Sequence, residues 1–281
     1  MQKGFSTELM NRRTFLKLTA GLIASYPFLI EHYIILVNEY RVPVPNLPKE
    51  FSGFRIAHLT DLHYGFLVPM RLMEWVVHQT NCLKKDLTVC TGDYVFQGVD
   101  SRRVDEIWPV LSKLEARKGV FSVLGNHDHW ADAEKSLYWA EKTGQNLRGK
   151  ARAFERNGKR IWFAGGGDLS HDHLDFDNLL SGIPEKDCRI VLAHNPDSAD
   201  LEYTARADLI IAGHTHGGQV IIPFMGPLIL PVRNKNYSHG IKKSDKNTTV
   251  FISKGIGWSI CPVRFNCHPE IAILELIPDK I

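Results

Sequence analysis

Short apolar runs alternate with longer amphipathic stretches from residue 54 onward. Residues 54–60 (FRIAHLT) form a short apolar run that ends in polar residues, which is typical of a buried strand. In residues 69–84 the apolar side chains fall near one 3.6-residue face, which predicts a helix. The alternation continues with predicted strands at 86–91 and 120–124 and a predicted helix at 104–114 that Pro109 kinks or splits. We therefore expect parallel strands joined by crossover helices, with catalytic groups at the C-terminal ends of the strands.

The pattern changes after residue 145. Residues 151–155 and 159–164 flank the turn sequence Arg156-Asn157-Gly158, which predicts a β-hairpin. Residues 235–247 are polar and charged and are expected to form a surface loop. Further strands are predicted at 189–193, 208–212, 219–222, 249–253 and 270–276. The sequence thus predicts an α/β chain with a second, partly antiparallel sheet.

The N-terminus has a different pattern. Residues 11–17 contain paired arginines, and residues 18–30 follow without a charge, so the segment resembles a twin-arginine export signal. The alternative is an ordinary N-terminal helix that begins with basic residues. No clear cleavage site follows and the apolar run resumes at residues 33–37, so the segment is either cleaved or kept as a membrane anchor. Residues 42–48 (VPVPNLP) cannot continue a helix, because proline lacks the N–H donor.

These boundaries divide the chain into three parts. We expect an N-terminal signal or membrane anchor at 1–40, a proline-rich linker at 41–50 and one globular domain at 51–281. Export by the twin-arginine route would place that domain in the periplasm or hold it at the membrane, facing outward. The alternative location is the cytoplasmic side of the inner membrane.

The composition excludes several classes of protein. Of 281 residues 44% are apolar and 23% are charged, which is typical of a folded globular protein. A formal net charge of +3 is too balanced for a chain whose main task is neutralising nucleic-acid phosphate. The five cysteines show no CxxC spacing and predict neither a disulfide framework nor a cysteine zinc site. Thirteen histidines are the unusual feature.

Five polar segments each follow a predicted strand, and together they form one constellation. Any one of them could be an ordinary turn, but their repetition places imidazole, carboxylate and amide groups at neighbouring strand ends. This oxygen and nitrogen donor set suits manganese, iron or zinc. Seven ligands are too many for one tetrahedral ion, so two divalent metal ions are expected, with Asp93 as their bridge and a bridging hydroxide as the nucleophile. The candidate ligands are Asp61, His63, Asp93, Asn126, His194, His214 and His216.

The ordered motifs D-x-H, G-D, G-N-H-D, H and G-H-T-H across residues 58–219 resemble those of the calcineurin-like metallophosphoesterase superfamily. Residues 193–197 and 213–219 are similar to its twin-arginine-exported bacterial phosphodiesterase branch. The resemblance implies a four-layer α/β fold, in which a two-sheet β-sandwich is flanked by helices. It also implies that His127 contacts the phosphate or protonates the leaving oxygen. Residues 255–269 match no ligand motif.

The resemblance also assigns the ligands to two metals. Asp61, His63, Asp93 and His216 would hold one ion, and Asp93, Asn126, His194 and His214 would hold the other. Asp128 either orients the His127 ring or makes a local turn bond, and both readings stay open. The chemistry of the side chain agrees with this role of His127, because an imidazole beside a ligating amide can reach over the site and transfer protons near neutral pH.

The leading expectation is a hydrolase, a dinuclear metal-dependent phosphodiesterase that acts as a monomer. An alternative is a membrane-associated hydrolase of a lipid-linked pyrophosphate of the UDP-diacylglucosamine type, and another is a non-catalytic metal-binding module. Apolar residues after two of the motifs, at Trp130, 224–225 and 228–230, could form an acyl-chain mouth, although core packing explains them as well. A nucleic-acid substrate is disfavoured by the absence of a run of lysine and arginine.

Overall fold

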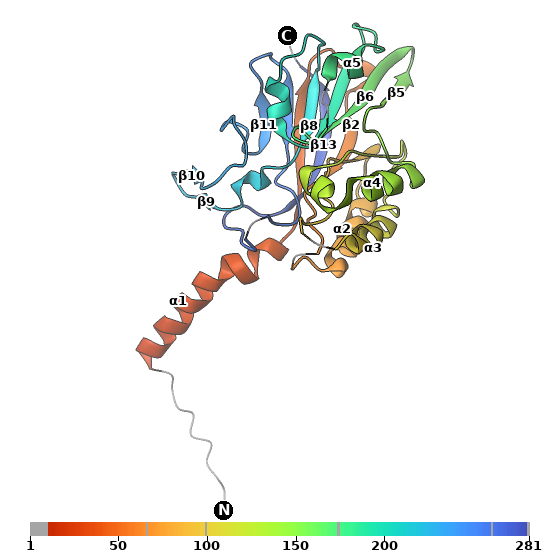
Figure 1. Cartoon of the computed structure of the whole chain (residues 1–281). Helices are drawn as coiled ribbons and strands as arrows, with labels where there is room; N and C mark the ends of the chain where they lie inside the picture. Colours follow the sequence, from red (N-terminus) through yellow and green to blue (C-terminus); the bar gives the residue numbers. More distant parts are fainter. Residues whose placement is uncertain (1–10, 66, 99, 173–174, 260, 280–281) are drawn as a thin grey trace, which may run out of the picture.

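The computed structural model describes residues 11–65, 67–98, 100–172, 175–259 and 261–279. Two sheets form the centre of the molecule (Figure 1). The five-stranded sheet has the order β1 (Leu36–Val44), β13 (Glu270–Pro278), β2 (Phe54–Leu59), β3 (Leu87–Cys90) and β4 (Val120–Ser122). The six-stranded sheet has the order β11 (Gly240–Lys243), β12 (Thr249–Ile252), β8 (Leu209–Ala212), β7 (Cys188–Ala193), β6 (Lys159–Gly167) and β5 (Ala151–Arg156). A separate hairpin joins β9 (Ile221–Ile222) and β10 (Gly226–Pro227).

The two sheets pack face to face and each carries helices on its outer face. In strand β7, the alternate side chains Ile190 and Leu192 belong to the core between the two sheets. Val191 and Ala193 belong to the core between the six-stranded sheet and α5. Helices α2 (Met70–Cys82), α3 (Arg102–Leu111) and α4 (Asn126–Lys142) lie over the first sheet, and α5 (Phe176–Leu180) over the second. Short 3₁₀ helices occur at Glu31–Tyr33, Lys49–Phe51, Pro196–Asp200 and His216–Gly218. The expected two-sheet sandwich flanked by helices is confirmed.

The N-terminal boundary of the fold differs from the expectation. Strand β1 pairs in parallel with β13 from Leu36 to Val44, and the side chains of Val42 and Val44 are completely buried. The expected linker at 41–50 is therefore wrong over its first part, and the fold begins near residue 36 rather than 51. Pro43 is tolerated because β1 lies at the edge of its sheet, where one side of the strand needs no hydrogen-bond donor.

Three other local features also differ from the expectation. The polar segment 235–247 contains β11, a half-exposed strand that pairs antiparallel with β12. Helix α4 was not expected from its polar sequence, and the chain is kinked at Asp132 within it. The expected strand at 219–222 is reduced to the two residues of β9. The polar composition of residues 235–247 and of α4 hides their structure, because a strand or helix with few apolar side chains gives only a weak periodic pattern.

Helix α1 (Arg12–Leu29) projects away from the sandwich (Figure 1) and none of its side chains is buried. No helix within the described residues is both long enough and apolar enough to span a bilayer.

Candidate metal centre

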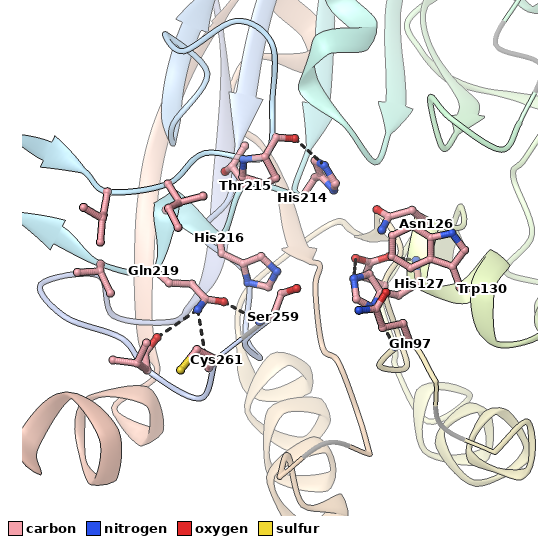
Figure 2. Close-up of a pocket in the computed structure, with 17 residues that line it drawn as sticks. Gln97, Asn126, His127, Trp130, His214, Thr215, His216, Gln219, Ser259 and Cys261 are labelled. Atoms are coloured by element: carbon pink, nitrogen blue, oxygen red, sulfur yellow. Dashed lines mark hydrogen bonds and ion pairs between the residues drawn. The ribbon is translucent and has the colours of Figure 1, made fainter.

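Each candidate ligand loop starts where a buried parallel strand ends. Figure 2 shows His214 and His216, from the loop after β8, facing Asn126 and His127 across a cavity. Several ligand candidates adopt left-handed backbone angles, which are rare for residues other than glycine and mark functional sites that the surrounding fold holds in place. Their φ values are 53° for Asp61, 50° for His63, 57° for Asp93, 68° for His214 and 51° for His216.

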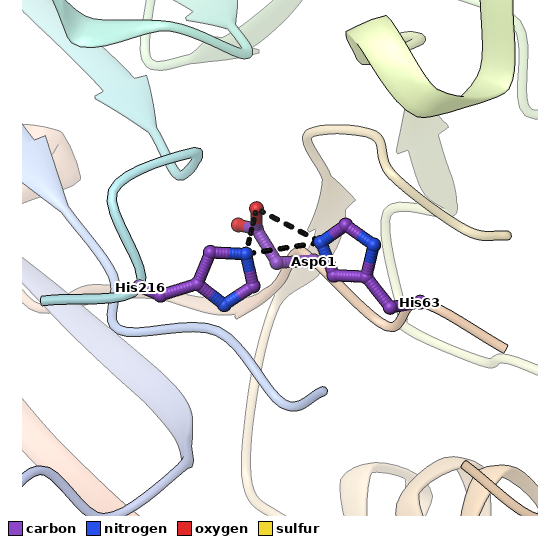
Figure 3. Close-up of side chains that lie close together, drawn as sticks. All are labelled: Asp61, His63 and His216. Atoms are coloured by element: carbon purple, nitrogen blue, oxygen red, sulfur yellow. Dashed lines mark hydrogen bonds and ion pairs between the residues drawn. The ribbon is translucent and has the colours of Figure 1, made fainter. Parts of the chain in front are cut away.

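One cluster contains Asp61, His63 and His216, all buried (Figure 3). The Nε2 atoms of His63 and His216 are 3.0 Å apart, and Asp61 Oδ1 lies 3.3 Å from His216 Nε2 and 3.9 Å from His63 Nε2. Asp61 is fixed by the Thr60 hydroxyl, which donates to its Oδ2 over 2.8 Å, and by the His214 N–H at 2.9 Å. Three donor atoms therefore converge on one point in a buried position.

A second cluster contains Asp93, His194 and His214. The carbonyl oxygens of Thr91 and Pro231 lie 2.8 Å from His194 Nδ1 and 3.1 Å from His214 Nε2. Because a carbonyl can only accept, these two ring atoms carry protons, so His194 Nε2 and His214 Nδ1 direct lone pairs at each other across 3.1 Å when both rings are neutral. Either a proton on one of the two rings or a metal cation between them makes that arrangement favourable.

The charge of Asp93 dominates the electrostatics of this second cluster. Burial opposes the protonated form of His194, but the charge of Asp93 and its hydrogen bond outweigh burial and raise the pKa of His194 to about 10. For Asp93, burial likewise opposes ionisation, but the charge and hydrogen bond of His194 hold its pKa well below the usual range. A metal ion would take the place of the proton on His194, so metal binding would release protons.

Asp93 lies between the two clusters. Its Oδ2 is 3.2 Å from His194 Nε2 and 3.5 Å from His63 Nε2, so one carboxylate oxygen reaches both sets of imidazoles. Its Oδ1 accepts the backbone N–H of His127 at 2.8 Å, which fixes the orientation of the group. This position is the one expected of a ligand shared by two ions.

Asn126 supplies an independent sign that the site is built for a cation. Its side-chain Oδ1 is buried, and no hydrogen-bond partner for it is found within the described part of the chain. A buried amide oxygen without a partner costs free energy, and coordination of a metal would satisfy it. The donor set, the facing lone pairs and this unpaired oxygen all fit divalent metal ions.

His127 is oriented by the backbone of another loop. The Gln97 N–H donates to His127 Nδ1 over 2.9 Å, so the proton of the neutral ring is on Nε2. That atom is 4.0 Å from Asp93 Oδ2 and lies beside the cavity. Burial lowers the pKa of His127, which favours the neutral ring. The ring therefore directs an N–H donor toward the site.

Asp128 makes the local turn bond that the sequence suggested and two longer-range bonds that it did not. Its carboxylate accepts the backbone N–H groups of Asp93 and Tyr94, both at 2.8 Å, and of Gly125 at 2.9 Å. The Gly125 bond is a local turn bond, but the other two join the Asp93 loop to the Asn126 loop. Burial and then the charge of Asp93 raise the pKa of Asp128 to about 7, although its bonds with Gly125 and Tyr94 favour the carboxylate. Gln97, rather than Asp128, orients His127.

We expect Asp128→Ala to lower the free energy of unfolding by about 3 kcal/mol or more, because it leaves three buried N–H groups without an acceptor. Chemical denaturation of the full chain measures this loss. Asp245→Ala, at an exposed turn, is the matched control and should change stability by less than about 0.5 kcal/mol. A loss at Asp128 no larger than that of the control would contradict the role assigned to its carboxylate.

The cavity beside these clusters has a volume of about 400 Å³ and two chemically different walls. Asp93, Asn126 and His127 belong to the polar wall, and Val220, Leu228, Ile229 and Val263 form an apolar wall opposite. Trp130 closes one side, with its ring centroid 4.8 Å from that of His127. The indole N–H of Trp130 donates to His171 Nε2 over 2.9 Å, so a second histidine holds the tryptophan in place.

The described residues of the segment 255–269, which matched no ligand motif, pack against the loop that carries Asp61 and against His216 of the candidate metal centre. The N–H of Gly257 donates to the carbonyl of Asp61 over 2.7 Å, and a Cβ at Gly255 would lie 2.7 Å from the Cβ of Asp61. Arg264 is fully buried, donates to the Gly257 carbonyl over 2.6 Å and lies 3.4 Å from His216 Nδ1. The closely spaced glycines were the only signal in the sequence, and they became informative only once the neighbouring Asp61 loop was known.

Gln219, directly after the G-H-T-H motif, connects this segment to the cavity. Its side chain accepts the N–H of Ser259 at 2.6 Å and donates to the carbonyl of Cys261 at 3.1 Å (Figure 2). Ser259 and Cys261 thereby become part of the cavity lining. Sequence reasoning missed both, because they contribute through backbone atoms.

The comparisons with known proteins agree with this architecture. The family model of the calcineurin-like phosphoesterases matches residues 54–218. The chain is 31% identical to the uncharacterized metallophosphoesterase YkuE of Bacillus subtilis, covering 95% of this chain and 98% of that protein. It is also 31% identical to the phosphodiesterase YaeI of Escherichia coli, covering 96% and 100% of the two chains.

Among solved structures, TT1561 of Thermus thermophilus superimposes with a TM-score of 0.50 at 14% identity, covering 73% of this chain and 91% of that one, which supports the fold alone. The match of the family model, which covers more than half of the chain, and the two full-length relatives carry the assignment. The chain belongs to the calcineurin-like phosphoesterase family.

Proposed function

We propose that the chain is a phosphodiesterase that works with two divalent metal ions. The observation that carries this proposal is the position of Asp93, whose Oδ2 lies 3.2 Å from a histidine of one cluster and 3.5 Å from a histidine of the other. Family membership and similarity to a relative named phosphodiesterase support the reaction class. The substrate would be a phosphodiester or a pyrophosphate.

The proposed roles follow from the geometry. Asp61, His63 and His216 would hold one ion and Asn126, His194 and His214 the other, with Asp93 shared between them. When bound, the ions supply Lewis-acid activation of the phosphoryl oxygens and of the attacking water. His127 presents its Nε2–H to the cavity, and the neutral ring would donate a hydrogen bond from this group to the leaving oxygen, which stabilises the charge that develops there. The cavity walls orient the two substituents on phosphorus and limit the access of bulk water.

Removal of metal tests the proposal. Protein loaded with Mn²⁺ should hydrolyse bis(p-nitrophenyl) phosphate, and chelation followed by dialysis should reduce the rate at least about 100-fold, because no side chain here replaces Lewis-acid activation. Returning Mn²⁺, Fe²⁺ or Zn²⁺ separately should restore activity and rank the metals. A chain that binds metal but turns over no diester would instead be the non-catalytic binding module.

A second candidate function is hydrolysis of a lipid-linked pyrophosphate of the UDP-diacylglucosamine type. The apolar wall formed by Val220, Leu228, Ile229 and Val263 favours it, since a soluble diester needs no such surface. Comparing kcat/KM on a soluble diester and on the lipid-linked pyrophosphate in detergent separates the candidates. Equal values for the two substrates would remove the support for a lipid substrate.

We also propose that the part of residues 1–40 that precedes β1 directs export by the twin-arginine route, with the periplasm or the outer side of the membrane as the destination. The paired Arg12 and Arg13 before an uncharged segment support this. Fractionation of cells that express the wild type and the Arg12→Lys/Arg13→Lys variant tests it. Wild-type protein found entirely in the cytosol would contradict export.

A further inference from the structure

The β9–β10 hairpin exposes an apolar tip. Residues 220–231 (VIIPFMGPLILP) contain no charged residue over twelve positions. Phe224 is fully exposed, Met225 is 79% exposed, and Leu228 and Ile229 are both 61% exposed. Phe224 also has φ of 67°, a left-handed value that a bulky residue rarely adopts. Contiguous exposed apolar side chains of this kind mark an interaction surface rather than ordinary surface composition.

The hairpin lies beside the base of helix α1. The N–H of Ile221 in β9 donates to the carbonyl of Phe265 over 2.9 Å, and the N–H of the adjacent Arg264 donates to the carbonyl of Pro27 in α1 over 3.1 Å. Two consecutive residues thus connect the root of the hairpin to the C-terminal end of the helix. Figure 1 shows both elements projecting from the same side of the sandwich.

Helix α1 shows which chemistry this face would contact. Phe15, Leu22 and Ile23 are each more than half exposed, as are several other apolar side chains of the helix. Its first two turns carry Arg12, Arg13 and Lys17, and residues 11–30 contain no acidic residue. Exposed apolar side chains together with basic residues and no acidic ones complement an anionic lipid surface.

We propose that the tip of the β9–β10 hairpin, residues 223–229, is a membrane-docking element that acts together with α1 and holds the mouth of the cavity at the surface of an anionic bilayer. Leu228 and Ile229 belong both to the exposed hairpin and to the apolar wall of the cavity. An apolar substituent of a phosphodiester could therefore pass from the lipid layer along this wall while its phosphate reaches the metal centre. The substrate part of this inference rests on the proposed function, and the docking part does not.

Tryptophan quenching in vesicles tests the docking directly. The full chain carrying Phe224→Trp is mixed with phosphatidylcholine and phosphatidylglycerol vesicles that contain brominated acyl chains, which quench only nearby indoles. The control is Lys159→Trp at the exposed β5–β6 turn, on the other side of the molecule. We expect quenching beyond the wild type for Phe224→Trp and none beyond it for Lys159→Trp. Vesicle-bound protein without excess quenching at residue 224, or protein that does not bind these vesicles, would overturn the proposal.

A double variant separates docking from catalysis. Neither Phe224 nor Met225 lines the cavity. Phe224→Asp/Met225→Asp should therefore reduce partitioning onto the vesicles about tenfold or more, because charges replace buried apolar area, while hydrolysis of soluble bis(p-nitrophenyl) phosphate stays unchanged. A wild-type dimer that this variant converts to a monomer, with vesicle binding unaffected, would show a self-association surface and overturn the proposal. If the wild type hydrolyses no diester, the proposed function is wrong but the docking proposal still stands, because the quenching measurement does not depend on turnover.

Discussion

Asp93→Asn is expected to reduce kcat/KM toward bis(p-nitrophenyl) phosphate by about 10³-fold, well beyond the 10–100-fold typical for a residue that only supports a metal ligand. The substitution keeps the size of the side chain but removes the negative charge that faces His63 and His194 at 3.5 Å and 3.2 Å. It also places an amide, with only one acceptor oxygen, where a carboxylate serves both clusters. Loss of one shared ligand should thus impair both halves of the site.

The control for this prediction is Asp245→Asn, which removes the same charge at an exposed turn and should leave kcat/KM unchanged. Circular dichroism on both variants verifies that the fold is kept. An Asp93→Asn enzyme that retains more than about a tenth of wild-type kcat/KM would show that the two clusters do not act through a shared carboxylate.

His127→Ala is expected to lower kcat by about 10²–10³-fold on an alkyl phosphodiester, the range for loss of one hydrogen-bond donor to a developing oxyanion. The effect should be much smaller when the leaving group is p-nitrophenolate, because that anion is stable without a hydrogen-bond donor. Alanine lacks the Nε2–H donor that the Gln97 N–H fixes on the histidine ring. The decisive measurement is the dependence of log kcat on leaving-group pKa, which should be steeper in the variant than in the wild type.

Metal content supplies the control for His127→Ala, since the substitution leaves the proposed ligands in place. Equal losses for good and poor leaving groups would contradict a hydrogen bond to the leaving oxygen and would indicate that His127 positions the phosphate instead.

The sequence predicted the features that depend on residue patterns over short stretches of the chain. Asp61, Asp93 and His194 each follow a short apolar strand within a few residues, so strand periodicity alone places them at strand ends, although β2 and β3 belong to one sheet and β7 to the other. The spacing of the apolar residues in α2 and α3 likewise predicted both helices. The positions of the strand ends, and therefore the grouping of the candidate ligands, could be predicted from the sequence alone.

The features that the sequence did not predict depend on contacts between residues that are far apart in the chain. Strand β1 is defined by pairing with β13, more than 230 residues away, and nothing local distinguishes a proline-containing edge strand from a linker. The hydrogen bond from the Gln97 N–H to His127 and those from Asp93 and Tyr94 to Asp128 use backbone donors, which any residue type supplies. Side-chain identity therefore carried no signal for these positions.

The number of metal ions bound per chain tests the central claim most directly. Protein loaded with Mn²⁺ and freed of excess ion should contain two manganese ions per chain by elemental analysis, and anomalous scattering should place them on either side of the Asp93 carboxylate. Asp93→Asn should hold fewer than two. A wild-type chain that binds one ion or none under saturating Mn²⁺, or an Asp93→Asn chain that still holds two, would contradict a centre built around this shared carboxylate.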